Sequence, residues 1–180
     1  ESLMLWNNRL TGTLPPELAS LSRIEFFSVF SNQIHGTIPP QYGQLKTLKS
    51  LKLYYNNLTG TLPKDIFSQT NLLTFGVDHN NLTGTIPTEI GQLKKLEYIN
   101  IANNRFSGSL PNSLSTLTKL QIILVNQNKF VSGANHDAFN FIGHNNSLSV
   151  LEMSDNAFTG TLHDDIFKNK LRKLTVFAAG

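Results

Sequence analysis

Apolar and polar residues follow one another along this chain in a pattern that recurs many times. In residues 48–63, LKSLKLYYNNLTGTLP, the pattern is LxxLxLxxNxLxGxLP. Leu51 and Leu53 stand two positions apart, so in a strand both side chains point to the same side. Asn56 turns the chain, and its side-chain amide can bond backbone groups that the turn leaves unpaired. One such unit cannot bury its leucines alone, so it needs a copy on each side.

The turn asparagine marks a fixed period. It recurs as Asn8, Asn32, Asn56, Asn80, Asn104, Asn128 and Asn156. The interval is 24 residues up to Asn128 and 28 residues after it. A constant period of this size is typical of a solenoid, in which stacked repeats bury a continuous core. We therefore predict about seven 24-residue repeats, with a buried ladder of hydrogen bonds through these asparagines.

Each repeat is predicted to contain a strand, a second short extended segment and a short helical turn. The first strands should stack about 4.8 Å apart into one curved parallel sheet. They are expected to centre on Leu3–Leu5, Phe27–Val29, Leu51–Leu53, Phe75–Val77, Ile99–Ile101, Ile123–Val125, Leu151–Met153 and Leu174–Val176. Thr59–Leu62 is an example of the second segment, and Pro87–Leu93 of the helical turn, which a proline can begin. The irregular repeat at 129–150 lacks the proline and carries four added residues, which should bulge outward.

The repeat LxxLxLxxNxLxGxIPxxLxxLxx, with its LTGTIP and FSGSLP variants, is similar to the plant-type leucine-rich repeat. The resemblance covers essentially all of residues 1–180. It implies an α/β fold: a right-handed solenoid with the curved parallel sheet on its concave side and short helical turns and second short strands on the other. Such arrays resemble the ectodomains of leucine-rich-repeat receptor-like kinases and receptor-like proteins, and the polygalacturonase inhibitors. The resemblance thus implies an extracellular or cell-surface recognition protein.

Residues 1–180 are expected to form a single solenoid domain. The chain starts inside a strand motif at Glu1 and stops at Gly180, after another strand has begun. A solenoid needs caps over its open ends, and neither end resembles a cap. We therefore expect a segment of a longer array, whose signal peptide or membrane anchor could lie outside it.

Composition argues against several classes of function. The net charge of +3 is too small for a nucleic-acid groove, which needs clustered Lys and Arg with interleaved aromatic residues. The chain has no cysteine, so disulfides and thiolate metal sites are impossible. No apolar stretch could span a membrane, so we expect no membrane contact from this segment itself. The five histidines are scattered and no nucleophile–base pair is recognisable, so we predict neither an enzyme nor a cofactor or metal site.

Outward positions on successive strands favour a ligand-binding surface. Trp6, Phe30 and Tyr54 each stand just after a strand, on three adjacent strands, and should form an exposed aromatic stripe. Gly76 should leave a shallow space beside this stripe. The candidate ligand-binding residues are Trp6, Phe26, Phe30, Tyr54, Tyr55, Tyr98 and, at the rim of that space, Asp78 and His79. The alternative is that aromatic residues on a parallel sheet only satisfy β-propensity and stack on one another.

Threonines form a second array, on the opposite face. They stand on either side of the repeat glycine, as in Thr59/Thr61 and Thr83/Thr85. A flat lattice of hydroxyl and methyl groups resembles the threonine arrays of ice-binding solenoids. The same residues are also ordinary in plant-type repeats, so their pattern alone does not identify an ice-binding surface.

The sequence also holds three N-glycosylation sequons, at Asn57, Asn81 and Asn145, which are compatible with secretion. Together these features predict a non-catalytic module that recognises a protein or peptide through its concave face, as part of an extracellular receptor or adhesion protein. The alternative function is an ice- or surface-binding solenoid that uses the outward threonines.

Overall fold

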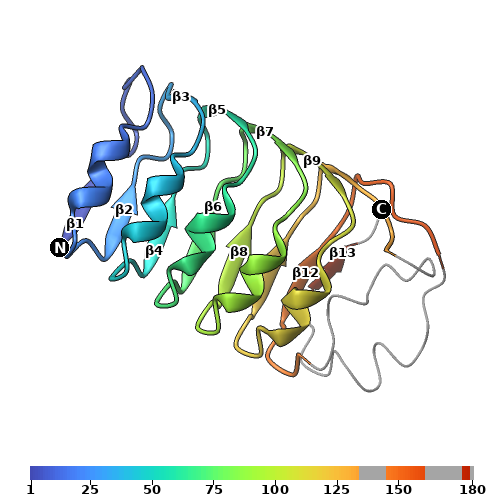
Figure 1. Ribbon diagram of the computed structural model, residues 1–180. Helices are drawn as coiled ribbons and strands as arrows, with labels where there is room; N and C mark the ends of the chain where they lie inside the picture. The colour runs from blue at the N-terminus through green and yellow to red at the C-terminus, as the bar shows by residue number, and fades with distance from the viewer. Residues whose placement is uncertain (134–144, 161–175, 179–180) are drawn as a thin grey trace.

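The computed structural model describes residues 1–133, 145–160 and 176–178, which coil into a curved solenoid (Figure 1). Successive coils lie side by side, with the N-terminus at one end of the array and the C-terminal strand at the other. A regular coil contains one strand of a long parallel sheet, one strand of a second sheet and one short 3-10 turn. The predicted solenoid architecture is therefore confirmed.

The first strands of the coils form an eight-stranded parallel sheet. In order across the sheet they are β1 (Ser2–Met4), β2 (Phe26–Ser28), β4 (Ser50–Lys52), β6 (Thr74–Gly76), β8 (Tyr98–Asn100), β10 (Ile122–Leu124), β12 (Val150–Glu152) and β13 (Val176–Ala178). The first seven begin one residue before the predicted strands. The second inward residue, such as Leu53, lies just beyond the strand, although its N–H still donates a hydrogen bond to the carbonyl of Gly76 at 2.8 Å. The outer side of this sheet is the concave face.

The second strands and the helical turns make up the rest of each coil. The five-stranded second sheet contains β3 (His35–Gly36), β5 (Asn57–Gly60), β7 (Asn81–Gly84), β9 (Arg105–Gly108) and β11 (Lys129–Phe130). The 3-10 turns are η1 (Pro16–Ser20), η2 (Pro40–Gln44), η3 (Lys64–Ser68), η4 (Thr88–Gln92) and η5 (Asn112–Thr116). A proline precedes each turn, one position earlier than predicted, and Pro63 is extended before η3, with φ −67° and ψ 130°. None of the helices in the described residues is long and apolar enough to cross a membrane.

Two predictions concern the C-terminal part of the chain. The last strand was expected at Leu174–Val176, but β13 places Phe177 opposite Leu151. That prediction was wrong because apolar residues at several neighbouring positions allow more than one register in this strand. The bulge expected within 129–150 falls on residues 134–144, which lie outside the described part of the chain.

The core lies between the eight-stranded sheet and the helical turns. Leu51 pairs in register with Phe27 and Phe75 on the adjacent strands, and all three side chains are at most 1% exposed. Tyr42, from η2, packs edge-on against Phe27 with ring centroids 5.6 Å apart. Its hydroxyl donates a hydrogen bond to the carbonyl of Pro15 at 3.2 Å, so this buried phenol keeps a polar partner.

Asn80 shows the hydrogen-bond ladder that the sequence predicted. Its Nδ2 donates to the backbone oxygens of Leu53, Val77 and Asp78 at 3.1, 3.1 and 3.2 Å. Its Oδ1 accepts a hydrogen bond from the Leu58 N–H at 2.9 Å. Leu53 and Leu58 belong to the preceding coil, so the side chain ties two coils together. Equivalent contacts recur along the array and continue past the irregular repeat.

The outward threonines contact the neighbouring coil. Gly84 has a φ of +80°, and a Cβ at this position would lie 2.8 Å from the methyl group of Thr61. A glycine is therefore needed both for the turn and for the threonine packed against it. The Thr83 hydroxyl donates a hydrogen bond to the carbonyl of Gly60 at 3.2 Å. Methyl and hydroxyl groups of this face thus help to hold the coils together.

Candidate ligand-binding face

Trp6, Phe30 and Tyr54 form a continuous stack on the concave face, which we call the aromatic row. They follow β1, β2 and β4 at equivalent positions. The rings of Trp6 and Phe30 are parallel within 1°, with centroids 5.4 Å apart, and those of Phe30 and Tyr54 are 4.3 Å apart at 15°. Trp6 remains 47% exposed. The predicted contiguity of the three rings is confirmed, and their mutual stacking also agrees with the alternative that they only stabilise the sheet.

A hollow of about 310 Å³ lies beside the aromatic row. Phe26, on β2, borders it and is 39% exposed. Ser28, two residues later, also lines the hollow and is only 3% exposed. The Ser28 hydroxyl has no hydrogen-bond partner among the described residues. A buried hydroxyl without a partner is unusual in a folded protein.

Tyr55 adds a second exposed ring next to the aromatic row. It is 50% exposed, stacks on the imidazole of His79 with centroids 4.0 Å apart, and meets Tyr54 edge-on at 6.0 Å. Its backbone is left-handed, with φ 52°. The same position is left-handed in every described coil, namely at Asn7, Ser31, Tyr55, His79, Asn103, Gln127 and Asp155. A bulky side chain in this conformation carries a cost on the order of 1 kcal/mol, whereas asparagine tolerates it.

This strain gives a stability prediction with a matched control. Gln127→Asn should raise the free energy of unfolding by roughly 0.5–1 kcal/mol, because Gln127 is strained and has no ring contact. Tyr55→Asn should gain less, because it also removes the stack on His79, worth about 0.5–1.5 kcal/mol. Urea denaturation of the two variants measures the difference. Equal gains would show that the Tyr55–His79 stack contributes nothing to the folded state.

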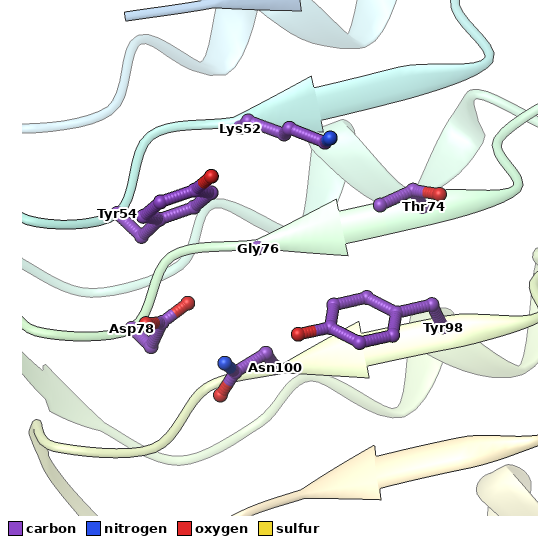
Figure 2. Close-up of a pocket in the computed structure, with 7 residues that line it drawn as sticks. All are labelled: Lys52, Tyr54, Thr74, Gly76, Asp78, Tyr98 and Asn100. Carbon is purple, nitrogen blue, oxygen red and sulfur yellow. The ribbon is translucent and has the colours of Figure 1, made fainter. Parts of the chain in front are cut away.

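A larger pocket, of about 470 Å³, lies beyond Tyr54 over β6 (Figure 2). It is lined by Lys52, Tyr54, Thr74, Gly76, Asp78, Tyr98 and Asn100. Gly76 forms its floor, where a Cβ would approach Cδ1 of Tyr54 to 3.3 Å. The space expected at Gly76 is therefore present. Two of the predicted ligand-binding residues, Tyr54 and Tyr98, border it. Lys52 and Tyr54 line both this pocket and the hollow at Phe26, so the two lie next to each other on the concave face.

Asp78 lies at the base of this pocket and not at its rim, which corrects the prediction. It is 5% exposed and stands two residues after β6, where it lines the pocket together with residues of the two adjacent coils. Its Oδ2 lies 2.9 Å from Nδ1 of the half-buried His79. Burial raises the pKa of the Asp78 carboxyl above its ordinary value, and the hydrogen bond from His79 opposes part of that shift. Burial also raises the pKa of the Tyr54 phenol, with the charge of Asp78 adding to it.

The raised pKa predicts how stability depends on pH. Above the ordinary carboxyl pKa of 3.8, folded Asp78 holds its proton longer than the unfolded chain does. The contribution of Asp78 to stability therefore falls as pH rises from 3.8 through the higher folded-state pKa. Asp78→Asn removes this pH-dependent contribution. The difference in free energy of unfolding, variant minus parent, should therefore increase as the pH rises from 3.8 through the folded-state pKa of Asp78. Urea titrations at several pH values test this, and a difference that is constant or decreases with pH would contradict it.

Lys52, Thr74 and Asn100 also line the pocket, although the sequence analysis did not single them out. They lie on β4, β6 and β8 at positions whose side chains face outward. A signal was available, because parallel strands in register place such positions side by side. Each is an ordinary polar residue of an exposed strand, however, so only the pocket between the coils distinguishes them.

The three sequon asparagines differ in exposure. Asn57, on β5, is exposed, and Asn81, on β7, is half-buried. Asn145 is only 2% exposed, and its Nδ2 donates hydrogen bonds to the carbonyls of Leu117 and Leu120, both at 3.1 Å. Since a glycan would be attached to this nitrogen, the geometry argues against a glycan on Asn145 in the folded chain. It leaves Asn57 as the most accessible of the three sites.

Comparisons with known proteins agree with the repeat pattern. The family model described as Leucine Rich Repeat matches residues 1–21, 47–68, 71–93 and 95–117. None of the curated proteins matches the sequence. Many solved structures do match.

Three of these structures are particularly informative. One is the ectodomain of the membrane receptor kinase GASSHO1/SCHENGEN3 from Arabidopsis thaliana, in complex with CASPARIAN STRIP INTEGRITY FACTOR 2. It is 31% identical to this chain and has a TM-score of 0.88. The match covers 100% of this chain and 21% of that ectodomain. The plant peptide hormone receptor RGFR1, in complex with RGF2, is 31% identical to this chain and has a TM-score of 0.81. The match covers 87% of this chain and 24% of the receptor chain. The Arabidopsis receptor kinase HAESA ectodomain, in complex with an IDA peptide hormone that is lengthened at its N-terminus, is 26% identical to this chain, with a TM-score of 0.81. This match covers 98% of this chain and 32% of the HAESA ectodomain. This chain thus spans between a fifth and a third of their length, and it belongs to the leucine-rich-repeat proteins with repeats of the plant type.

Proposed function

We propose that this chain is a non-catalytic recognition module that binds an extended peptide, or an extended loop of a partner protein, on its concave face. The observation that carries the proposal is the surface formed by the aromatic row, the hollow at Phe26 and the pocket over Gly76. This surface combines exposed rings with a buried carboxylate. Aromatic anchors surrounded by a few fixed polar groups are typical of binding sites.

The dimensions of this surface suit an extended peptide. It crosses five adjacent strands, from β1 to β8. At about 4.8 Å between strands, that span is roughly 19 Å, which an extended chain covers with about six residues. The rings have few rotatable bonds, so they lose little conformational entropy when a ligand covers them.

Relatives support the same class of ligand. The three receptors compared above were solved with a peptide hormone or with the integrity factor named in their complexes. Since they resemble this chain over only part of their length, we take from them the class of ligand and no specific peptide. By the same reasoning we propose that this chain belongs to a cell-surface receptor. A glycan on Asn57 would lie on the second sheet, away from the concave face, and would leave the proposed site open.

The threonine array is the weaker candidate for a binding surface. Its hydroxyls donate to carbonyls of the adjacent coil, as Thr59 does to Gly36 at 3.3 Å. Its methyl groups pack against the repeat glycines. An ice-binding surface needs these groups free to meet water, so their contacts within the fold favour a structural role.

Selection from a library of random linear peptides tests the proposed function. We expect peptides that bind the purified chain saturably and compete with one another for one site. Their affinity should fall for Phe30→Ala, which removes the central ring of the aromatic row. Asn126→Ala is the matched control, because Asn126 stands at the equivalent position after β10. Failure to select any saturable binder, or binders that respond equally to both variants, would overturn the proposal.

A further inference from the structure

The pocket over Gly76 contains a fixed negative charge. Asp78 is 5% exposed, and its Oδ2 faces His79 Nδ1 at 2.9 Å. Its other oxygen, Oδ1, lies only 3.7 Å from the point that a Cβ on Gly76 would occupy. The space that the glycine leaves open is therefore space directly against a carboxylate oxygen. Within the described residues no lysine or arginine forms an ion pair with Asp78.

Tyrosine rings from the two coils adjacent to Asp78 also line this pocket. Figure 2 shows Tyr54 at one end of the pocket and Tyr98 along β8, with the Tyr98 hydroxyl directed toward Asn100 and Asp78. Tyr54 approaches the floor within 3.3 Å of the point where a Cβ on Gly76 would lie. A cation near the face of a tyrosine ring is attracted by the ring, and a carboxylate in the same pocket adds to this attraction. Carboxylate and rings thus favour a positively charged group.

Lys52 carries the opposite charge to Asp78 and lies across the pocket from it, on β4 (Figure 2). It is half-buried, with a long flexible side chain, whereas Asp78 is buried and fixed. An ammonium group that stays hydrated interacts more weakly with a ligand than a desolvated carboxylate does. An acidic ligand group in this space would lie against the Asp78 carboxylate, and the two negative charges would repel each other.

We propose that this pocket binds a basic side chain of the peptide ligand, preferably arginine, with Asp78 as its counter-charge and Tyr54 and Tyr98 against its guanidinium plane. This inference rests on the proposed function and adds the chemical class of one ligand residue. Arginine is preferred over lysine because its planar group stacks on aromatic rings and donates several hydrogen bonds at once. The pocket volume of about 470 Å³ accommodates such a side chain.

The test uses short peptides that differ in one side chain. The probes are acetylated and amidated Gly-Ser-X-Ser-Gly peptides, in which X is arginine, citrulline or glutamate. Binding is followed by the NMR shifts of the Gly76 and Asp78 backbone amides, which also report weak complexes. The arginine peptide should bind roughly tenfold more tightly than the citrulline peptide, which has the same shape without the charge. Equal binding of these two peptides, or tighter binding of the glutamate peptide, would overturn the proposal.

Two variants of opposite expected sign sharpen this test. Asp78→Asn keeps the shape of the side chain and should abolish the preference for arginine over citrulline. Lys52→Gln removes the opposing charge and should strengthen binding of the arginine peptide by about twofold to fivefold. A preference that survives Asp78→Asn, or weaker arginine binding by Lys52→Gln, would contradict the assignment.

Gly76→Leu is a further variant that leaves both charges in place and fills the pocket floor. Thermal melting checks that each variant is folded, and if Asp78→Asn is not, Gly76→Leu decides. Loss of arginine binding by Gly76→Leu supports the proposal, and unchanged binding overturns it.

Library-selected peptides separate this inference from the proposed function. If they bind through Phe30 but respond to neither pocket variant, the recognition function stands and the basic-residue pocket does not.

Discussion

Asn80→Ala should lower the free energy of unfolding by about 3 kcal/mol. This is on the order of the cost of leaving two or three buried backbone groups without a hydrogen-bond partner. In the folded chain the Asn80 side chain satisfies the Leu58 N–H and three backbone carbonyls. Alanine cannot bond any of them, and the site is too buried for water to replace the amide easily. Because Asn80 joins two coils, the loss should also weaken the contact between repeats, on which a solenoid depends.

Asn57→Ala provides the control for this prediction. Asn57 is exposed on β5, so its replacement should change the free energy of unfolding by less than about 0.5 kcal/mol. Both variants are compared by urea denaturation of protein made without glycosylation. If Asn80→Ala shifts the midpoint no more than Asn57→Ala, the hydrogen-bond ladder does not hold the coils together.

Tyr54→Ala should weaken binding of a library-selected peptide by about 2 kcal/mol, or roughly 30-fold in Kd. Tyr54 is the one ring that stacks in the aromatic row and also lines both hollows of the concave face. Its removal therefore disrupts the proposed site on both sides. The cost to stability should be only about 1 kcal/mol, the worth of its stack on Phe30 at 4.3 Å.

Tyr54→Phe separates the ring from its hydroxyl. This variant keeps the stack, so it should retain most of the affinity, whereas Asn126→Ala on a distant coil should retain all of it. Calorimetric titration of one selected peptide against the three variants gives the comparison. The same affinity for Tyr54→Ala as for Asn126→Ala would leave the aromatic row with a purely structural role.

The repeat pattern was sufficient to predict the coil and the alignment of the aromatic row. Parallel strands in register bring equivalent positions together, so Trp6, Phe30 and Tyr54 had to be neighbours once the period was known. Strand ends were less accurate, because the pattern marks inward residues such as Leu51 and Leu53 and not the limits of backbone pairing. The last strand was misplaced where closely spaced apolar residues gave the pattern several equivalent choices.

The depth of the pocket could not be predicted from single positions. Asp78 stands at an outward position of the pattern, yet it is buried in a pocket that residues of the two adjacent coils also line. Ser28 and Asn145 are buried for similar reasons, through residues of other coils. Burial at such positions depends on the neighbours above and below, which an analysis of one repeat does not include.

A crystal structure of the chain with a library-selected peptide would show directly which face binds the ligand. We expect an extended peptide across β1 to β8 on the concave face, in contact with Trp6, Phe30 and Tyr54. A peptide bound to the threonine face, to the 3-10 turns or to an end of the solenoid, with the aromatic row left open to solvent, would contradict it.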